Sequence, residues 1–252
     1  MLKYVQLDGP SEDAFKQLSD HPLTARVSFD GEKFWVDGKN VQQGLTDNLK
    51  KRFYSNYKAP TGWAPYEFTS NKELGEKVHK QLHCIYTCST RGFCTCLKRT
   101  NPKKLHPLAK TAKLFLEKND LTPMATEFSI YSPSIGMCTA LDMVAYGHRY
   151  TLHQRSVIIS WKTGYHADYD QDKSGQFLDQ PLDKYASSPQ HHNKLQSIME
   201  YKILEKDYGI KFDCYITVYL GHKGKFTYTP EHLKEQSLYK CKGNEIYSLM
   251  CK

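Results

Sequence analysis

The sequence lacks any apolar run long enough to cross a bilayer, since a membrane-spanning helix needs about 20 consecutive apolar residues. Its N-terminus also lacks the apolar stretch of a secretory signal peptide, because Met1-Leu-Lys-Tyr-Val-Gln6 leads directly into polar sequence. Of the 252 residues, 39% are hydrophobic and 25% are charged, which is typical of a folded globular protein and excludes a disordered tail. We therefore expect an intracellular protein without a signal peptide or transmembrane segment.

Internal repeats and low-complexity segments are also absent from the sequence. A chain of 252 residues can bury a substantial core and fits one large domain with appendages. We expect an N-terminal arm with a short helix at residues 1–23, a core domain at 24–220, and a C-terminal helix and tail at 221–252.

Paired C-x2-C knuckles, the usual mark of a structural zinc site, are missing among the eight cysteines. Four of the cysteines lie in the segment Cys84–Cys96, which follows His79 and His83, so zinc binding by this cluster stays an open alternative. In a reducing compartment the thiols are expected to remain free. Cys241 and Cys251 could instead form intermolecular disulfides once the protein meets an oxidising setting.

Acidic residues are fewer than basic ones, and the formal net charge is +8. A basic surface suits DNA binding, with candidate phosphate contacts at Lys50–Arg52, Lys98, Arg99, Lys103 and Lys104, and a merely solvated basic surface is the alternative. The 18 tyrosines and 11 histidines are many for a chain of this length. Tyrosine supplies a large contact area with a polar tip, which favours protein–protein interfaces.

Three strand-like runs carry the most informative residues of the chain. Each is rich in β-branched or aromatic residues and bounded by turn formers, and they are Glu127–Tyr131, Met137–Tyr146 and Val157–Lys162. Phosphodiester hydrolysis by a divalent cation needs oxygen ligands, a metal-bound water of lowered pKa and a positive group near the phosphate. Glu127 and Asp142 can supply the oxygens, and Lys162 can supply the positive charge.

One acid that such a site needs is missing. Two residues before Lys162, where the period-two alternation of a strand would point a second carboxylate at the same metal, the sequence has Ser160. A neutral hydroxyl is a weak ligand for a divalent cation, so a site with two carboxylates is weakened. The alternative is that Asp142 and Lys162 form an ordinary ion pair, with Trp161 packed in the core on the opposite strand face.

The order of Glu127, Asp142 and Lys162 resembles that of the PD-(D/E)xK nuclease superfamily. The surrounding sequence is similar to the RecB-like exonuclease branch of that superfamily, which includes homologues in large DNA viruses. Upstream of the strands, Gly75-Glu-Lys-Val-His79 resembles the Gly-x-x-x-His helix of this branch.

Further matches lie at both ends of the resemblance. Asp30-Gly31, between two strand-like runs, resembles the N-terminal hairpin of the family, and Leu195-Gln196 followed by Tyr201–Leu204 resembles the helix that carries its glutamine. Together these segments cover about residues 24–220, so the resemblance implies that the core domain is nuclease-like.

The departures from the family pattern lie in the active site. The family's Ala-Gly-Thr-Ile-Asp is replaced by Cys138–Asp142, without the glycine, and its Asp-Trp-Lys is replaced by Ser160–Lys162. An acid that commonly follows the helical histidine by four residues is His83 here. The resemblance therefore implies a nuclease-like fold whose catalytic residues are degenerate and vestigial.

Periodicity and turn signals predict a mixed α/β fold, with a central mixed sheet of about five strands wrapped by a larger share of helices. A hairpin is expected at residues 26–36, a further strand at 212–220 and a long polar loop at 164–188. Helices are expected at about 10–22, 41–54, 71–87, 108–119 and 189–207, and from Thr229-Pro230 to about 240.

The degenerate site and the tyrosine-rich composition favour a non-catalytic structural protein that assembles with itself. This combination resembles the crystalline matrix of a viral occlusion body, in particular a nudivirus polyhedrin. The resemblance implies that the partners are copies of the same chain, with virions as cargo, in the nucleus or cytoplasm of an infected cell. It implies no cofactor.

The alternative is a magnesium-dependent DNA exonuclease of the same superfamily. In that case Glu127 and Asp142 would bind Mg²⁺, Lys162 would stabilise the scissile phosphate, Gln196 would assist near the phosphate and His79 would support the metal. Without such a role, His79 is a packing or surface histidine and Gln196 caps a backbone group.

Overall fold

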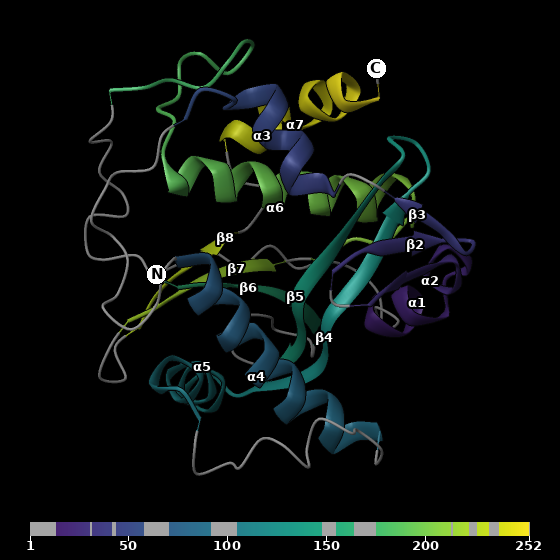
Figure 1. Cartoon of the computed structure of the whole chain (residues 1–252), viewed down its shortest axis with the longest axis vertical. Coiled ribbons are helices and arrows are strands. Elements are labelled where there is room, and N and C mark those ends of the chain that lie inside the picture. Colours follow the sequence, from purple (N-terminus) through teal and green to yellow (C-terminus); the bar gives the residue numbers. More distant parts are fainter. Residues whose placement is uncertain are drawn as a thin grey trace.

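The structure is a computed structural model of the chain, and it has a mixed α/β architecture with two sheets (Figure 1). Helices make up a larger share of the described residues than strands, as expected. The described residues are 14–30, 32–41, 44–57, 71–91, 105–147, 155–163, 175–212, 214–221, 226–231 and 237–251.

The central sheet has five strands in the order β4-β5-β6-β7-β8. They are β4 (Leu121–Ser132), β5 (Met137–Gly147), β6 (Arg155–Lys162), β7 (Cys214–Leu220) and β8 (Phe226–Glu231). Neighbouring strands are antiparallel except β6 and β7, which are parallel. A parallel pair needs a crossover connection. The helix α6 (Pro189–Lys206) provides it, beginning after the N-cap Ser188 with Pro189 in its first turn.

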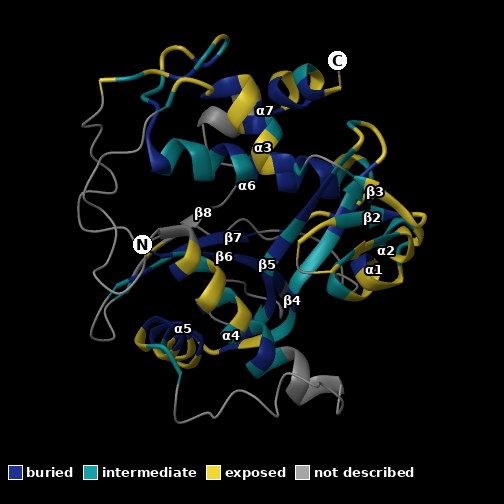
Figure 2. Cartoon of the chain, in the orientation of Figure 1, coloured by how far each residue is buried: buried dark blue, intermediate teal, exposed yellow. Residues whose placement is uncertain are grey.

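Helices cover both faces of the central sheet. On one face lie α4 (Asn71–Arg91) and α5 (Pro107–Lys118), whose buried residues share a core cluster with Val157, Ile159 and Trp161 of β6. On the other face α6 packs together with α3 (Leu45–Phe53) and α7 (Ser237–Met250) (Figure 1). Because both faces are covered, β5, β6 and β7 are buried almost throughout, as Figure 2 shows.

A second, three-stranded antiparallel sheet lies beside β4. Two of its strands were predicted as a hairpin, whereas the third strand and the separation from the central sheet were not. The helices α1 and α2 precede it in the chain, and β1 and β2 form the predicted hairpin. At its turn Asp30 accepts hydrogen bonds from the backbone of Glu32 and Lys33 and from the indole of Trp35. The elements are α1 (Ala14–Asp20), α2 (Pro22–Arg26), β1 (Val27–Phe29), β2 (Phe34–Val36) and β3 (Lys39–Val41).

One predicted helix is wrong and one short helix was not predicted. The helix expected at 10–22 is found as α1 in the described part of that segment, and the additional helix α2 follows it at Pro22–Arg26. The helix expected to start at Thr229-Pro230 is wrong, because Thr229 and Pro230 pair with Thr217 and Ile216 and belong to β8. Since β8 is the edge strand of the sheet, a proline is tolerated there, and the terminal helix α7 begins only at Ser237.

Among the residues that the structure describes, no helix combines the length and the apolar character that crossing a membrane requires.

Candidate functional site

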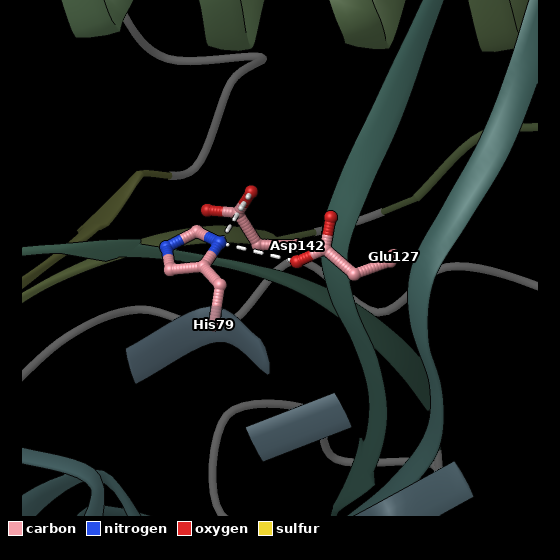
Figure 3. Close-up of side chains that lie close together, drawn as sticks. All are labelled: His79, Glu127 and Asp142. Carbon is pink, nitrogen blue, oxygen red and sulfur yellow. Dashed lines mark hydrogen bonds and ion pairs between the residues drawn. The ribbon is translucent and has the colours of Figure 1, made fainter. Parts of the chain in front are cut away.

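Three side chains from three elements converge beside the central sheet (Figure 3). They are His79 of α4, Glu127 of β4 and Asp142 of β5, and each offers a nitrogen or oxygen atom within 4.8 Å of the other two. The Nδ1 atom of His79 lies 3.1 Å from Oε1 of Glu127 and 3.8 Å from Oδ1 of Asp142. We call these three residues the acidic cluster.

The pairing of β4 with β5 brings the two acids together. Thr126 pairs with Met143 and Phe128 pairs with Leu141, so Glu127 lies opposite Asp142 between these two pairs. Cross-strand neighbours have Cβ atoms about 5 Å apart, close enough for both carboxylates to face one ion.

The backbone is irregular at this point of the hairpin. Glu127 has a φ of 50°, in the left-handed region that non-glycine residues rarely adopt. In a regular strand Leu141 and Met143, two residues apart, would lie on the same face of the sheet. Here Leu141 packs on the side of α6 and Met143 on the side of α4 and α5, so the alternation of faces is interrupted at Asp142. Irregular strand geometry of this kind re-aims side chains and is frequent near functional sites.

A glycine one helical turn before His79 allows α4 to come close to the end of β6. A Cβ atom on Gly75 would lie 3.3 Å from Oγ1 of Thr163, which is tighter than usual packing. This close approach brings Nε2 of His79 to 3.3 Å from the carbonyl oxygen of Trp161. The spacing of the Gly75–His79 segment therefore has a direct structural reason.

The geometry around His79 requires a charged imidazolium. Nδ1 faces a carboxylate oxygen of Glu127 and Nε2 faces the carbonyl oxygen of Trp161, and both partners can only accept hydrogen bonds. Burial lowers the pKa of His79, but the negative charges of Asp142 and Glu127 outweigh burial and raise that pKa to about 9. His79 is therefore a cation between two carboxylates at neutral pH.

Ser160 lies where a metal-binding acid was expected, and its hydroxyl donates to Oδ2 of Asp142 at 2.9 Å. The backbone N–H of Trp161 donates to the same oxygen at 2.8 Å. The backbone pairing of β5 with β6 stops at the pair Met143 and Ile159, before it reaches Trp161. The backbone N–H of Trp161 therefore bonds to the side chain of Asp142 in place of a backbone carbonyl of β5. One carboxylate oxygen of Asp142 is thus occupied in holding β6.

Lys162 lies two residues beyond Ser160 on the same face of β6, and its side chain is half-buried. The interpretation of Asp142 and Lys162 as an ion pair is wrong, because among the described residues the charged partner of Asp142 is His79. Lys162 still acts on the cluster through its charge, which opposes the protonation of His79.

Within the part of the chain that the structure describes, Gln196 of α6 bonds to a side chain and caps no backbone group. Its side-chain amide donates to Oε1 of Glu200 at 2.8 Å, one helical turn further along α6. Glu200 is only 1% exposed and was not singled out from the sequence. The signal that could have revealed it is an acid in the middle of the apolar segment Ile198–Leu204.

The other candidate residues fall outside this cluster or outside the described part of the chain. His83 contacts Oγ1 of Thr126 at 2.8 Å. Cys84 is a buried free thiol and Cys251 an exposed one, and the Lys50–Arg52 segment is exposed at the end of α3. The side chains of Cys88, Lys98, Arg99, Lys103, Lys104 and Cys241, with Cys94 and Cys96, lie outside the described residues.

The acidic cluster has the donor types that bind divalent cations. One imidazole nitrogen with two carboxylates is a set that suits Mn²⁺ better than Mg²⁺, which prefers oxygen ligands. To bind a metal, His79 must lose the proton that it shares with Glu127, so the cation competes with a proton for the same nitrogen. The set is therefore chemically suitable but weak.

No protein-family model matches this chain, and no curated protein sequence matches it either.

Proposed function

We propose that this chain is a non-catalytic structural protein on a nuclease-like scaffold, and that it assembles with itself into the matrix of a viral occlusion body. The observation that carries the proposal is the hydroxyl of Ser160, which lies 2.9 Å from Oδ2 of Asp142 in the place where a nuclease of this kind needs an acid. In this proposal the chain keeps the scaffold of a nuclease but has lost the ligand that would make it a strong cation site.

The charge balance of the site supports the absence of catalysis. The negative charges of Glu127 and Asp142 are matched by the positive charges of His79 and Lys162, so a metal ion gains little net attraction. An aspartate in place of Ser160 would leave the same site with one excess negative charge. The neutral hydroxyl thus removes both a ligand and the charge that attracts a cation.

Surface chemistry supports assembly between copies of the chain. Five of the 18 tyrosines are buried in the core, but Phe177 and Tyr228 are large aromatic side chains that are 61% and 39% exposed and offer contact area to another molecule. The thiol of Cys251 is exposed in the structure and available for a bond to another chain. The chain itself is therefore the partner in this proposal, and no cofactor is needed.

The test combines an assembly assay with a cleavage assay. We expect cells that express the chain to accumulate particles that diffract, and we expect a Cys251→Ser variant to give particles that dissolve more readily without reductant. Purified protein should leave single- and double-stranded DNA intact in Mg²⁺ or Mn²⁺. A soluble monomer whose DNA cleavage disappears in a Lys162→Ala variant would overturn the proposal.

The second candidate is a metal-dependent deoxyribonuclease, which is favoured by the convergence of His79, Glu127 and Asp142 within 4.8 Å. In this function the acidic cluster would bind Mg²⁺ or Mn²⁺, Lys162 would stabilise the charge on the phosphate, and Gln196 would assist near it. Cleavage that is strong in Mn²⁺ and raised further by Ser160→Asp would select this candidate.

A further inference from the structure

Glu200 is a carboxyl group buried between α6 and the central sheet. It is 1% exposed, and its oxygens accept hydrogen bonds from three side chains on three elements. Gln196 of α6 donates at 2.8 Å, Thr139 of β5 donates at 3.3 Å, and the hydroxyl of Tyr215 on β7 lies 2.5 Å away. Glu200 therefore connects α6 to two strands that are not adjacent in the sheet.

The neighbouring charges of Glu200 come from the strands under α6. Asp142 of β5 disfavours ionisation of Glu200, and Lys162 of β6 favours it. Tyr215 of β7 is the third titratable neighbour, and burial raises its pKa far above the ordinary value, so it stays a neutral donor. The charges of Asp142 and Lys162 act on the pKa of Glu200 in opposite directions. Burial is therefore the largest influence on that pKa.

Burial favours the protonated form of Glu200. It raises the pKa of this carboxyl from 4.5 to about 7, although the hydrogen bonds from Tyr215 and Gln196 act in the opposite direction. In the unfolded chain the carboxyl ionises near its ordinary value. Since the folded protein holds the proton more tightly, the stability that protonation provides is fully present below pH 4.5 and is lost as the pH rises through about 7.

We propose that Glu200 is a proton-binding switch in the interior of the fold. The hydrogen bonds that Glu200 accepts from Gln196, Thr139 and Tyr215 favour the ionised form, but ionisation also places a buried negative charge near Asp142. The unfavourable burial of this charge outweighs the hydrogen bonds, so ionisation weakens the packing of α6 on the sheet. The helix α6 also packs against α3 and α7, so the change acts on the whole layer of helices that covers this face of the sheet. The proposal concerns the fold and does not depend on the proposed function.

The first experiment compares the unmodified chain with Glu200→Gln. Glutamine has the same shape and hydrogen-bonding capacity but cannot ionise. Urea unfolding at pH 5 and pH 8.5 should show that the folding equilibrium constant of the unmodified chain falls roughly 100-fold more than that of the variant. Glu117→Gln, at an exposed position of α5, serves as the matched control and should behave like the unmodified chain.

The second experiment observes the proton directly and covers the case in which Glu200→Gln does not fold. The infrared band of a protonated carboxyl group should persist in the folded unmodified chain above pH 5 and disappear near pH 7. In Tyr215→Phe, which loses a donor to the carboxylate, the disappearance should move to higher pH. An absent band, together with equal pH dependence of the unmodified chain and Glu200→Gln, would overturn the proposal.

Discussion

The hydroxyl of Ser160 donates to Asp142 across 2.9 Å, and this hydrogen bond determines what the acidic cluster can do. It satisfies one oxygen of a partly buried carboxylate without adding charge, whereas an acid at the same position would repel Asp142 unless a cation lay between them. The site is therefore stable without a metal. A nuclease site of full strength would depend on its metal for that stability.

The first prediction concerns a Ser160→Asp variant. Without a divalent cation, the new carboxylate lies beside Asp142, and we expect the free energy of unfolding to fall by about 1–3 kcal/mol. Added Mn²⁺ should restore most of this loss, because a cation that binds only the folded state stabilises it. Thermal unfolding in chelator and in Mn²⁺ measures both effects.

Ser160→Asn is the matched control for that experiment. Asparagine is close to aspartate in size but carries no charge. The free energy of unfolding of the Ser160→Asn variant should therefore not rise when Mn²⁺ is added. Equal responses of the two variants to Mn²⁺ would contradict the electrostatic explanation.

The second prediction concerns the pH dependence that His79 contributes. Its pKa is raised from 6.5 to about 9, so the stability from the charged imidazole is fully present below pH 6.5 and is lost as the pH rises through about 9. A His79→Gln variant should be less stable by about 2–3 kcal/mol at pH 6, and this difference should shrink toward pH 10.

The pKa of His79 can also be measured directly from its imidazole resonances. Glu127→Gln should lower this pKa, since the charge and hydrogen bond of Glu127 help to raise it. A pKa of His79 near 6.5 in the unmodified chain would show that the acidic cluster does not hold a cationic imidazole.

The third prediction uses the unusual backbone of Glu127, whose φ is 50°. Glu127→Ala and Glu127→Gly both remove the carboxylate, but only glycine adopts this conformation without a steric cost. We expect Glu127→Gly to be more stable than Glu127→Ala by about 1 kcal/mol in urea unfolding. At a strand position with ordinary backbone angles, the alanine variant would be more stable than the glycine variant. If Glu127→Ala proves more stable than Glu127→Gly, the left-handed backbone at Glu127 is contradicted.

The sequence predicted most elements of the central sheet because their composition and turns are strong local signals. The strands around Asp142 and Lys162, the hairpin with Asp30 and the helix that begins at Pro189 are all found. The segment at Thr229-Pro230 has an equally strong helix-start signal, yet it pairs with β7. Antiparallel pairing with the preceding strand β7 overrode the local helix-start signal there.

The three residues of the acidic cluster were named from the sequence, but the contacts between them were not predicted. Strand alternation predicted a common face for Ser160 and Lys162, but it could not predict the irregular backbone at Glu127 or the role of His79 as the charged partner of Asp142. Glu200 was missed because its importance comes from burial against β5 and β7, and burial of a single acid in a helix leaves only a faint trace in the sequence.

The most direct test of the central claim is a calorimetric titration of the unmodified chain and Ser160→Asp with Mg²⁺ at pH 7. The claim is that two carboxylates balanced by His79 and Lys162 hold Mg²⁺ too weakly for catalysis. We expect no saturable binding by the unmodified chain below concentrations on the order of 1 mM, and saturable binding by the variant. Tight binding of Mg²⁺ by the unmodified chain that is lost in Glu127→Gln would contradict the claim.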